Sequence, residues 1–307
     1  MRIGVSLGSF HPVDDPRLGA RHMIERTRAV RDAGLDLLSV GDHHVNDRPY
    51  YQNTPILGRL LAEWDDRPAG SLYLVPLWSA VLMAEQIGTL AAIAQGPFVV
   101  QTGLGGGPAE SAAIGVDHRT RVSRYEETIR VVRALLAGEV VTSDRLGIEG
   151  ARISPTPAEP AQWWIGGGAD TALDRAARLG DAWYGGPDLE PPAASERLRY
   201  FLAACDREGR EPSCFPLRRD VFVADSAAEA KRVGDEMIAA GYRGMTSDAV
   251  VYGGVEEVVH RFGELGKLGF TDIIVRQMAV PQARAVESYH LLGEVRRQLD
   301  ASEGANS

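Results

Sequence analysis

Two adjacent histidines that follow a short apolar run are the residues of this sequence best suited to proton transfer. After the run at residues 35–40 the chain reads Gly41, Asp42, His43 and His44. A histidine titrates near neutral pH, so its ring can give or take a proton or polarise an oxygen. Asp42 could fix which ring nitrogen carries the proton. The alternative is that one histidine caps a turn and the other is solvated. Because adjacent histidines seldom point at one ion, we expect no metal here.

Two glycine-rich segments could hold the flat ring or the phosphate of a cofactor. The first, residues 101–108, reads Gln-Thr-Gly-Leu-Gly-Gly-Gly-Pro, which allows close approach to a ligand but also suits a plain flexible loop. The second contains Gly166, Gly167 and Gly168 and runs from an apolar segment into a helical pattern. A strand that passes through glycines into a helix aims free amides at an anion, and the helix dipole adds to the attraction. We therefore expect the second segment to bind phosphate.

An alternation of strand-like and helix-like patterns must position these segments. Short β-favouring runs alternate with longer runs at helical spacing. The eight predicted strands begin near Ile3, Leu35, Ser71, Phe98, Trp163, Ala182, Leu217 and Thr271. Eight such units without a linker predict an α/β fold, a single (β/α)8 TIM barrel with inserted loops, whose chemistry lies in the loops after the strands. The competing doubly wound sheet would need a glycine fingerprint after the first strand, where the chain reads Gly-Ser-Phe-His-Pro.

The pattern also indicates how the chain is divided. Residues 1–300 form one predicted domain, and residues 301–307 form a tail that we expect to be disordered. Residues 140–153 carry the glycine and aspartate punctuation of a small hairpin. A chain of 307 residues can bury a core without covalent staples, so Cys205 and Cys214 are not read as a disulfide framework.

The charge balance points to a small-molecule function. Lysine and arginine number 33 against 42 aspartates and glutamates, which gives a formal net charge of −9. The basic residues are scattered, so we expect no nucleic-acid partner and no anionic membrane surface. The sequence shows no long apolar segment, and we expect a cytoplasmic protein whose partner is a small-molecule substrate.

Four stretches recur, in this order and spacing, in one enzyme family. They are residues 39–44, residues 74–77 with 84–90, residues 103–107 with 121–127, and residues 165–168 with 176–183. Together they resemble the bacterial luciferase-like family of flavin- and deazaflavin-dependent oxidoreductases. The resemblance implies a (β/α)8 barrel that binds FMN or the deazaflavin F420 at its C-terminal mouth and that forms a homodimer.

The resemblance also implies roles for individual residues. His43 corresponds to the family's active-site histidine, and Val75 to a bulge after the third strand that supports the ring system. Thr102 and Gly103 would lie beside the ring or the ribityl chain. The residues implied near the phosphate are Tyr125, Gly166, Gly167 and Gly168.

Two positions depart from the family pattern. Residues 95–98 read Gln-Gly-Pro-Phe where members often have Gly-Gly-Arg-Phe, so an arginine contact is missing. Pro108 stands where sugar-phosphate dehydrogenases that use F420 carry a glutamate. The second departure favours monooxygenation with FMN over hydride transfer with F420, although other deazaflavin branches lack that glutamate too.

Three classes of function remain open. The leading one is a flavin-dependent oxidoreductase or monooxygenase acting on a small apolar substrate, with an F420-dependent reductase or dehydrogenase as its variant. The second is a metal-dependent hydrolase on the same barrel, with His11, Asp42, His43 and His44 as ligands. The third is a cofactor-binding protein without turnover. The apolar pocket is inferred from aromatic residues in predicted loops, Tyr50, Tyr51, Trp64 and Trp78.

Overall fold

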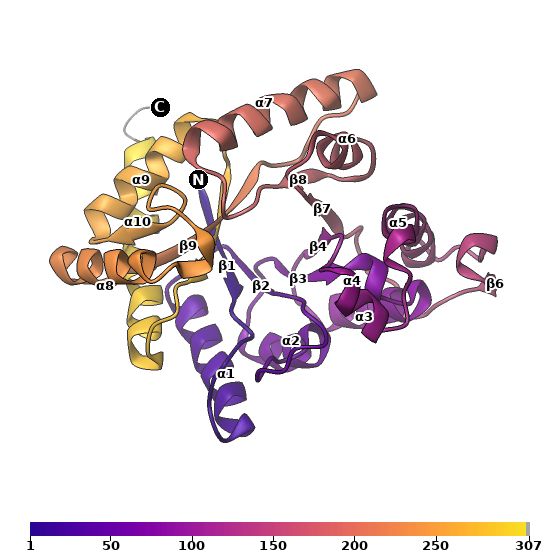
Figure 1. Ribbon diagram of the computed structural model, residues 1–307, viewed down its shortest axis with the longest axis horizontal. Helices are drawn as coiled ribbons and strands as arrows, with labels where there is room; N and C mark the ends of the chain where they lie inside the picture. Colours follow the sequence, from indigo (N-terminus) through magenta and orange to yellow (C-terminus); the bar gives the residue numbers. More distant parts are fainter. Residues whose placement is uncertain (305–307) are drawn as a thin grey trace.

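The protein folds into a barrel of parallel strands surrounded by helices (Figure 1). The structure, a computed structural model, describes residues 1–304. The parallel sheet consists of β1 (Arg2–Leu7), β2 (Leu37–Val40), β3 (Ala69–Leu74), β4 (Phe98–Gly103), β7 (Gln162–Gly166), β8 (Ala182–Tyr184), β9 (Pro216–Val223), β10 (Val251–Gly253) and β11 (Asp272–Gln277). The helices are α1 (Pro16–Asp32), α2 (Asn53–Leu60), α3 (Ala80–Ile93), α4 (Pro108–Ala113), α5 (Arg121–Leu136), α6 (Asp170–Leu179), α7 (Pro191–Glu208), α8 (Ala227–Ala239), α9 (Val255–Lys267) and α10 (Gln282–Gly304).

The sheet closes on itself, which confirms the predicted (β/α)8 barrel. Its strand order is β10-β9-β11-β1-β2-β3-β4-β7-β8. The circle closes between β8 and β9 at Gly185, whose amide donates to the Pro216 carbonyl (2.9 Å) and whose carbonyl accepts from the Arg218 amide (3.0 Å). The strands of the closed circle are the eight that the sequence predicts. The further strand, β10, pairs with the C-terminal half of β9 and is not among the predicted strands.

Local signals in the sequence set the ends of the helices. Asp15 caps α1, because its Oδ1 accepts a hydrogen bond from the Arg17 amide (2.9 Å). Pro16, which has no amide to satisfy, occupies the first turn. After α1 the chain turns at Gly34, whose φ of 73° lies in the left-handed region that favours glycine.

Side chains inside the barrel form two layers. The deeper layer is apolar and contains Leu37, Val99, Trp164, Ala182 and Ile274. Since alternate residues of a strand face the same side, the next inward positions lie two residues further along. These positions are occupied by Ser39, Gln101, Tyr184 and Arg276. The Gln101 amide donates to Ser39 Oγ (3.3 Å), as expected for two residues of one layer. The interior therefore becomes polar toward the C-terminal ends of the strands.

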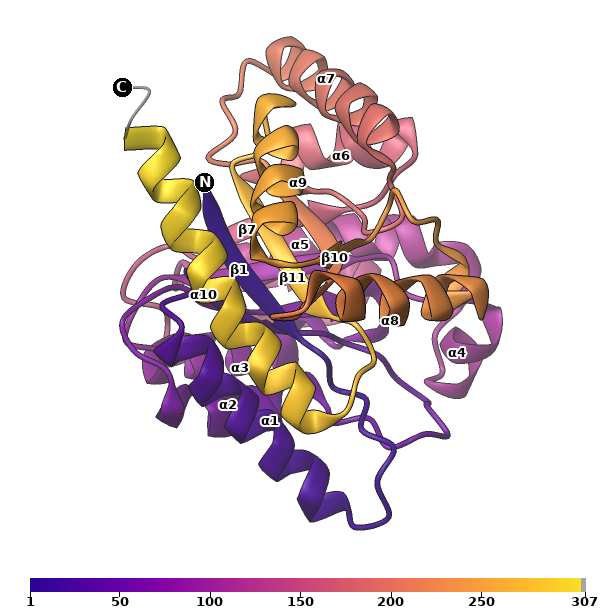
Figure 2. The same ribbon diagram turned by 90° about the vertical axis from the view of Figure 1, so that its left-hand side faces the viewer.

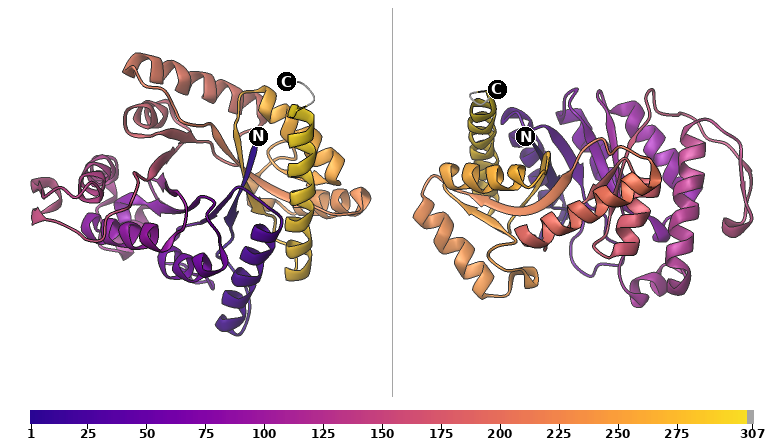
Figure 3. Two further views of the ribbon diagram at one scale, coloured as in Figure 1. Left: turned by 180° about the vertical axis from the view of Figure 1, so that it is seen from behind. Right: turned by 90° about the horizontal axis from the view of Figure 1, so that it is seen from above.

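Helix α10 and a small hairpin lie on opposite sides of the barrel, as the two views in Figure 3 show. The hairpin consists of the antiparallel strands β5 (Val141–Ser143) and β6 (Ile148–Ala151), and it confirms the predicted hairpin. Helix α10 runs beside β1 and α1 (Figure 2). Helix α10 extends to Gly304 and so includes residues 301–304 of the predicted tail, while residues 305–307 lie outside the described residues.

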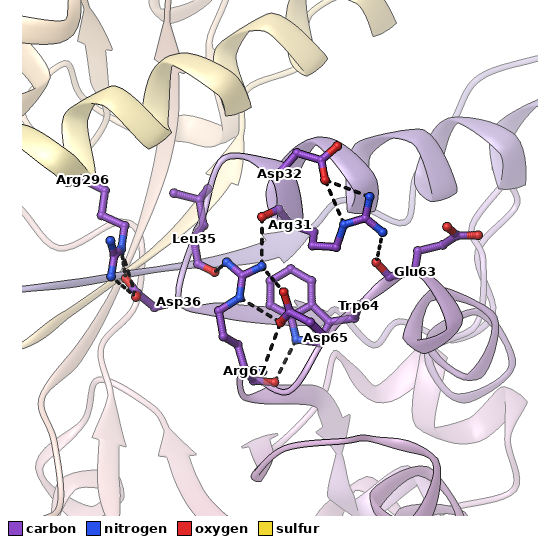
Figure 4. A network of polar contacts seen from close by, with 9 residues as sticks. All are labelled: Arg31, Asp32, Leu35, Asp36, Glu63, Trp64, Asp65, Arg67 and Arg296. Atoms are coloured by element: carbon purple, nitrogen blue, oxygen red, sulfur yellow. Dashed lines mark hydrogen bonds and ion pairs between the residues drawn. The ribbon is translucent and has the colours of Figure 1, made fainter.

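An ion pair fastens α10 to the first β-α-β unit. The Arg296 guanidinium contacts both carboxylate oxygens of Asp36 at 2.8–3.0 Å (Figure 4). Asp36 Oδ2 also accepts a hydrogen bond from the Ile3 amide of β1 (2.7 Å).

Both cysteines, Cys205 and Cys214, are buried and form no disulfide bond. Among the helices of residues 1–304, none is long and apolar enough to cross a membrane.

Candidate functional site

A cavity of about 610 Å³ opens at the C-terminal mouth of the barrel. Its wall is built from residues of six strands, β1, β3, β4, β8, β9 and β11, and from the loop after β2, as in other barrels of this type. The residues that represent these elements are Ser6 of β1, His43 of the loop, Gln101 of β4, Tyr184 of β8, Arg218 of β9 and Arg276 of β11. The cavity is therefore the place where residues from distant parts of the chain converge.

His43 lines this cavity, where the sequence predicts a proton-transfer group. Its side chain is 47% exposed, and its Nδ1 lies 3.4 Å from Oε1 of Glu110. The ring of Tyr50 meets it edge-on, with 5.6 Å between the centroids. Glu110 belongs to α4, and its side chain is only 11% exposed. A carboxylate beside one ring nitrogen orients the imidazole, as a general acid or base requires.

His44 has a different environment and a structural role. Its Nε2 lies 3.2 Å from Oδ1 of the buried Asp42, and this contact raises the pKa of His44. Asp42 Oδ2 accepts hydrogen bonds from the Leu74 amide and from Trp78 Nε1, both at 2.8 Å. The Asp42 carboxylate therefore ties the β2 loop to the end of β3. Asp42 does fix a neighbouring ring, but the ring is that of His44.

The four proposed ligands of a metal-dependent hydrolase do not converge. His43 pairs with Glu110 and His44 with Asp42, while His11 faces a second cavity. Within residues 1–304 no group of three or more histidine, cysteine, aspartate or glutamate side chains is arranged to hold a metal ion. The hydrolase alternative therefore lacks a ligand set in the described part of the chain.

Three of the predicted cofactor contacts lie behind the cavity wall. Val75 is buried in a short 3-10 turn, Val75–Leu77, directly after β3. The Tyr125 hydroxyl lies 2.6 Å from Thr102 Oγ1, which in turn donates to the Trp164 carbonyl (3.2 Å), and both side chains are buried. Burial raises the pKa of Tyr125. The structure thus engages this hydroxyl with Thr102, whereas Gly103 ends β4 at the mouth.

The three glycines after β7 differ in what surrounds them. A Cβ on Gly166 would lie 2.8 Å from the Thr102 carbonyl oxygen, and one on Gly167 would lie 2.6 Å from the Ala172 Cβ. Gly167 also has a φ of 139°, which is strained for other residues. At Gly168 no atom lies within 4 Å of the position that a Cβ would take, so the space beside it is open. Helix α6 begins directly after this loop without a side-chain cap, which leaves its first amides for a ligand.

An arginine cluster, which the sequence analysis did not identify, forms another part of the wall. It consists of Arg218, Arg243 and Arg276, which all line the cavity, together with the carboxylate of Asp220. Arg218 Nη2 lies 3.4 Å and Arg243 Nε lies 3.5 Å from this fully buried carboxylate. The signal available in the sequence is the period of two within β9 and β11, which places Arg218, Asp220 and Arg276 on the inward side.

Of the four aromatic residues predicted to line the pocket, three do not line it. Tyr50 does line the cavity, but Trp78 donates to Asp42 and the Tyr51 hydroxyl donates to the Pro16 carbonyl. Trp64 lies far from the mouth, where its Nε1 donates to the Arg67 carbonyl (2.9 Å) beneath the Arg67 guanidinium (Figure 4). The sequence places Tyr51, Trp64 and Trp78 in predicted loops, but in the structure a hydrogen bond holds each side chain away from the cavity.

The buried His11 makes the stability of the protein sensitive to acid. Its side chain lies beside a second cavity of about 490 Å³, and its Nε2 contacts the Gly8 carbonyl (3.1 Å). Burial, reinforced by the charge of Arg26, lowers the pKa of His11 to about 4. Between about pH 6.5 and pH 4, His11 is therefore protonated in the unfolded chain but neutral in the folded protein. The free energy of unfolding consequently decreases as the pH falls through this range.

We predict that His11→Gln removes this acid sensitivity. Glutamine can donate to the same carbonyl but does not titrate in this range. At about 1.4 kcal/mol per pKa unit, the wild type should lose about 3 kcal/mol more than the variant between about pH 7 and pH 4. Urea unfolding curves across this pH range measure the difference. Parallel losses in the two proteins would show that other groups govern the acid response.

The fold and the site define a TIM-barrel protein with a histidine and a glycine-rich loop at its mouth. A family model described as luciferase-like monooxygenase matches residues 1–286, so the chain belongs to the luciferase-like family. Curated relatives include an uncharacterized protein, Rv0940c, of Mycobacterium tuberculosis, 29% identical over 175 residues. That alignment covers 55% of this chain and 59% of the relative, so the chain matches little more than half of the relative's length.

Solved structures share the fold along nearly the whole chain. Monooxygenase RslO1 from Streptomyces bottropensis superposes with a TM-score of 0.84 and 17% identity over 97% of this chain and 99% of that one. An FMN complex of a 3,6-diketocamphane monooxygenase component from Pseudomonas putida has a TM-score of 0.78, 15% identity and coverage of 96% and 98%. An F420-dependent secondary alcohol dehydrogenase has a TM-score of 0.78, 15% identity and coverage of 97% and 98%. At these identities the likeness shows the fold alone.

Proposed function

We propose that this protein is an oxidoreductase that binds FMN or F420 at the mouth of the barrel and acts on a small molecule. The observation that carries the proposal is the placement of His43, oriented by Glu110, on the wall of the cavity at the C-terminal end of the strands. The family and the FMN- and F420-dependent neighbours support this choice of cofactors. When bound, either cofactor supplies hydride, and reduced FMN can also activate oxygen.

The residues present suit such a cofactor. Gly168 leaves open space beside the uncapped start of α6, where amides can receive a phosphate. Gly103 and Val75 lie at the ends of β4 and β3, next to each other in the sheet, and would face or support the ring system. Thr102 and Tyr125 would support the cofactor from behind the wall rather than contact its phosphate.

His43 and Glu110 would then handle the proton. His43 holds or releases a proton at a ring nitrogen that faces the substrate, while Glu110 keeps the ring oriented through Nδ1. Asp42 and His44 keep the neighbouring loop in place. Glu110 also bears on the choice of cofactor, because a carboxylate stands two residues after Pro108 and reaches the site. The proline therefore does not exclude F420 chemistry, and the proposal retains both cofactors.

The test is an absorbance titration of the purified protein with FMN and with F420. We expect a saturable spectral change with one of them, followed by oxidation and reduction of the bound cofactor. Oxygen uptake by the reduced FMN complex would establish monooxygenation, whereas binding of F420 without binding of FMN would exclude it. Binding without any redox turnover would leave a cofactor-binding protein, and no binding of either would overturn the proposal.

A further inference from the structure

The arginine cluster holds more positive charge than the surrounding protein neutralises. Two guanidinium groups, those of Arg218 and Arg243, contact the single carboxylate of Asp220, and a third, that of Arg276, lines the same cavity. That carboxylate is also engaged by the Tyr242 hydroxyl, which donates to its Oδ2 (3.0 Å). Partly buried charges are costly unless they are paired, so this wall is poised to receive negative charge.

Arg276 is the member of the cluster that has no partner. Among the described residues, 1–304, no hydrogen bond or ion pair joins its guanidinium to another group, although it lies within the barrel mouth. Burial, together with the charges of Arg218 and Arg243, lowers the pKa of Arg276. Arg218 contributes a second unused donor, because its buried Nε has no acceptor. Two arginines with free donors on neighbouring strands, β9 and β11, match the oxygens of one anionic group.

The arginine donors lie apart from the glycine loop, so we expect them to contact the substrate and not the cofactor phosphate. The cluster lies on β9, β11 and the turn Tyr242–Gly244, while the glycine loop follows β7, and β8 separates β7 from β9 in the sheet. Arg243 and Arg276 also line the second cavity, so they stand where the two cavities meet. A ligand held here by an anionic end would extend into the cavity that His43 lines.

We propose that the substrate carries a carboxylate or another oxyanion, which Arg276 and Arg218 bind while Arg243 adds charge from the rim. The identification of the bound oxyanion as the substrate rests on the proposed function. The binding of an oxyanion to the arginine cluster does not depend on it. It replaces the sequence-based expectation of an apolar substrate.

The test compares probes that differ only in charge. Benzoate and its neutral analogue benzamide are titrated into the protein by calorimetry, with sodium sulfate as a second anion. We expect benzoate to bind at least tenfold more tightly than benzamide, since guanidinium groups form stronger hydrogen bonds with a carboxylate than with a neutral amide. Equal binding of the two, or no binding of either anion, would overturn the proposal.

Variants locate the binding and separate it from the cofactor. Arg276→Met and, independently, Arg218→Met should weaken benzoate binding at least tenfold, whereas Arg119→Met, which removes the same charge at an exposed position, should not. Near-ultraviolet circular dichroism checks that each variant is folded. If Arg276→Met instead weakens FMN or F420 binding tenfold and benzoate does not bind, the arginines serve the cofactor and the proposal fails. If neither cofactor binds the wild type but benzoate does, the proposed function fails and the anion site stands.

Discussion

Replacing Gly168 by aspartate is expected to weaken cofactor binding by about a hundredfold or more while the protein stays folded. The loop 166–168 would receive the cofactor phosphate on amides at the start of α6, and a carboxylate placed there meets the phosphate with like charge. A hundredfold loss corresponds to about 3 kcal/mol, which is the range expected when a charged hydrogen-bonding site is blocked. Titration with FMN and with F420, followed by absorbance, measures the affinity.

At Gly168 a side chain can be introduced without distorting the loop, so a loss of binding there reports on the cofactor and not on the fold. At Gly167 any side chain would collide with Ala172 and strain the backbone, so a loss of binding there could reflect distortion. Gly168→Asn is the matched control, because asparagine has the size and shape of aspartate without its charge and should therefore lose much less affinity. Wild-type affinity in a folded Gly168→Asp protein would place the phosphate elsewhere, and the arginine cluster would be the next candidate.

Replacing His43 by alanine is expected to lower turnover by roughly a hundredfold and to leave cofactor affinity almost unchanged. A positioned general acid or base typically contributes about 10²–10⁴ in rate. His43 lies on the cavity wall and away from the glycine loop, so its loss should affect the proton and not the phosphate. Stopped-flow reoxidation of the reduced cofactor measures the rate, with oxygen for FMN and with a small ketone for F420.

His44→Ala is the control that separates chemistry from structure. His44 contacts Asp42, which holds the Leu74 amide and Trp78, so this variant should lower stability more than turnover. Glu110→Gln should retain part of the activity, because an amide oxygen can still accept from the ring but the charged partner is lost. A His43→Ala protein that turns over at the wild-type rate would assign His43 a structural role.

The barrel could be predicted from the sequence because its elements have strong local signals. Short apolar runs such as Ile3 to Leu7 favour a β-strand over a helix. Gly34 ends a helix because glycine readily adopts the positive φ needed there. The elements that the prediction missed, β10, α2 and α4, are short and depend on tertiary contacts. Helix α10 continues beyond Leu299 although the composition there resembles that of a tail, because the helix packs on α1, α9 and β9.

The site was predictable where one short segment determines it and unpredictable where distant segments meet. Asp42 and His43 follow a strand directly, so their place at the mouth follows from the fold. Glu110 lies on a helix that was not predicted, and the arginine cluster joins β9, β11 and a turn between them. The inward direction of Arg218 and Arg276 is encoded in the strand period, but their convergence on one cavity becomes evident only when the barrel is closed.

The way the barrel closes has a consequence for how the chain folds. β1 finds one of its two neighbours, β2, within the first 40 residues, but its other neighbour is β11, and Arg296 is 260 residues from the Asp36 that it binds. Such distant contacts carry a large loop-closure entropy and slow the final step of folding. At roughly 5–20 residues per second, ribosomal synthesis of the intervening chain takes tens of seconds. During that time one edge of β1 presents unpaired amides and carbonyls, so nascent chains of this protein should depend on chaperones that cover that edge.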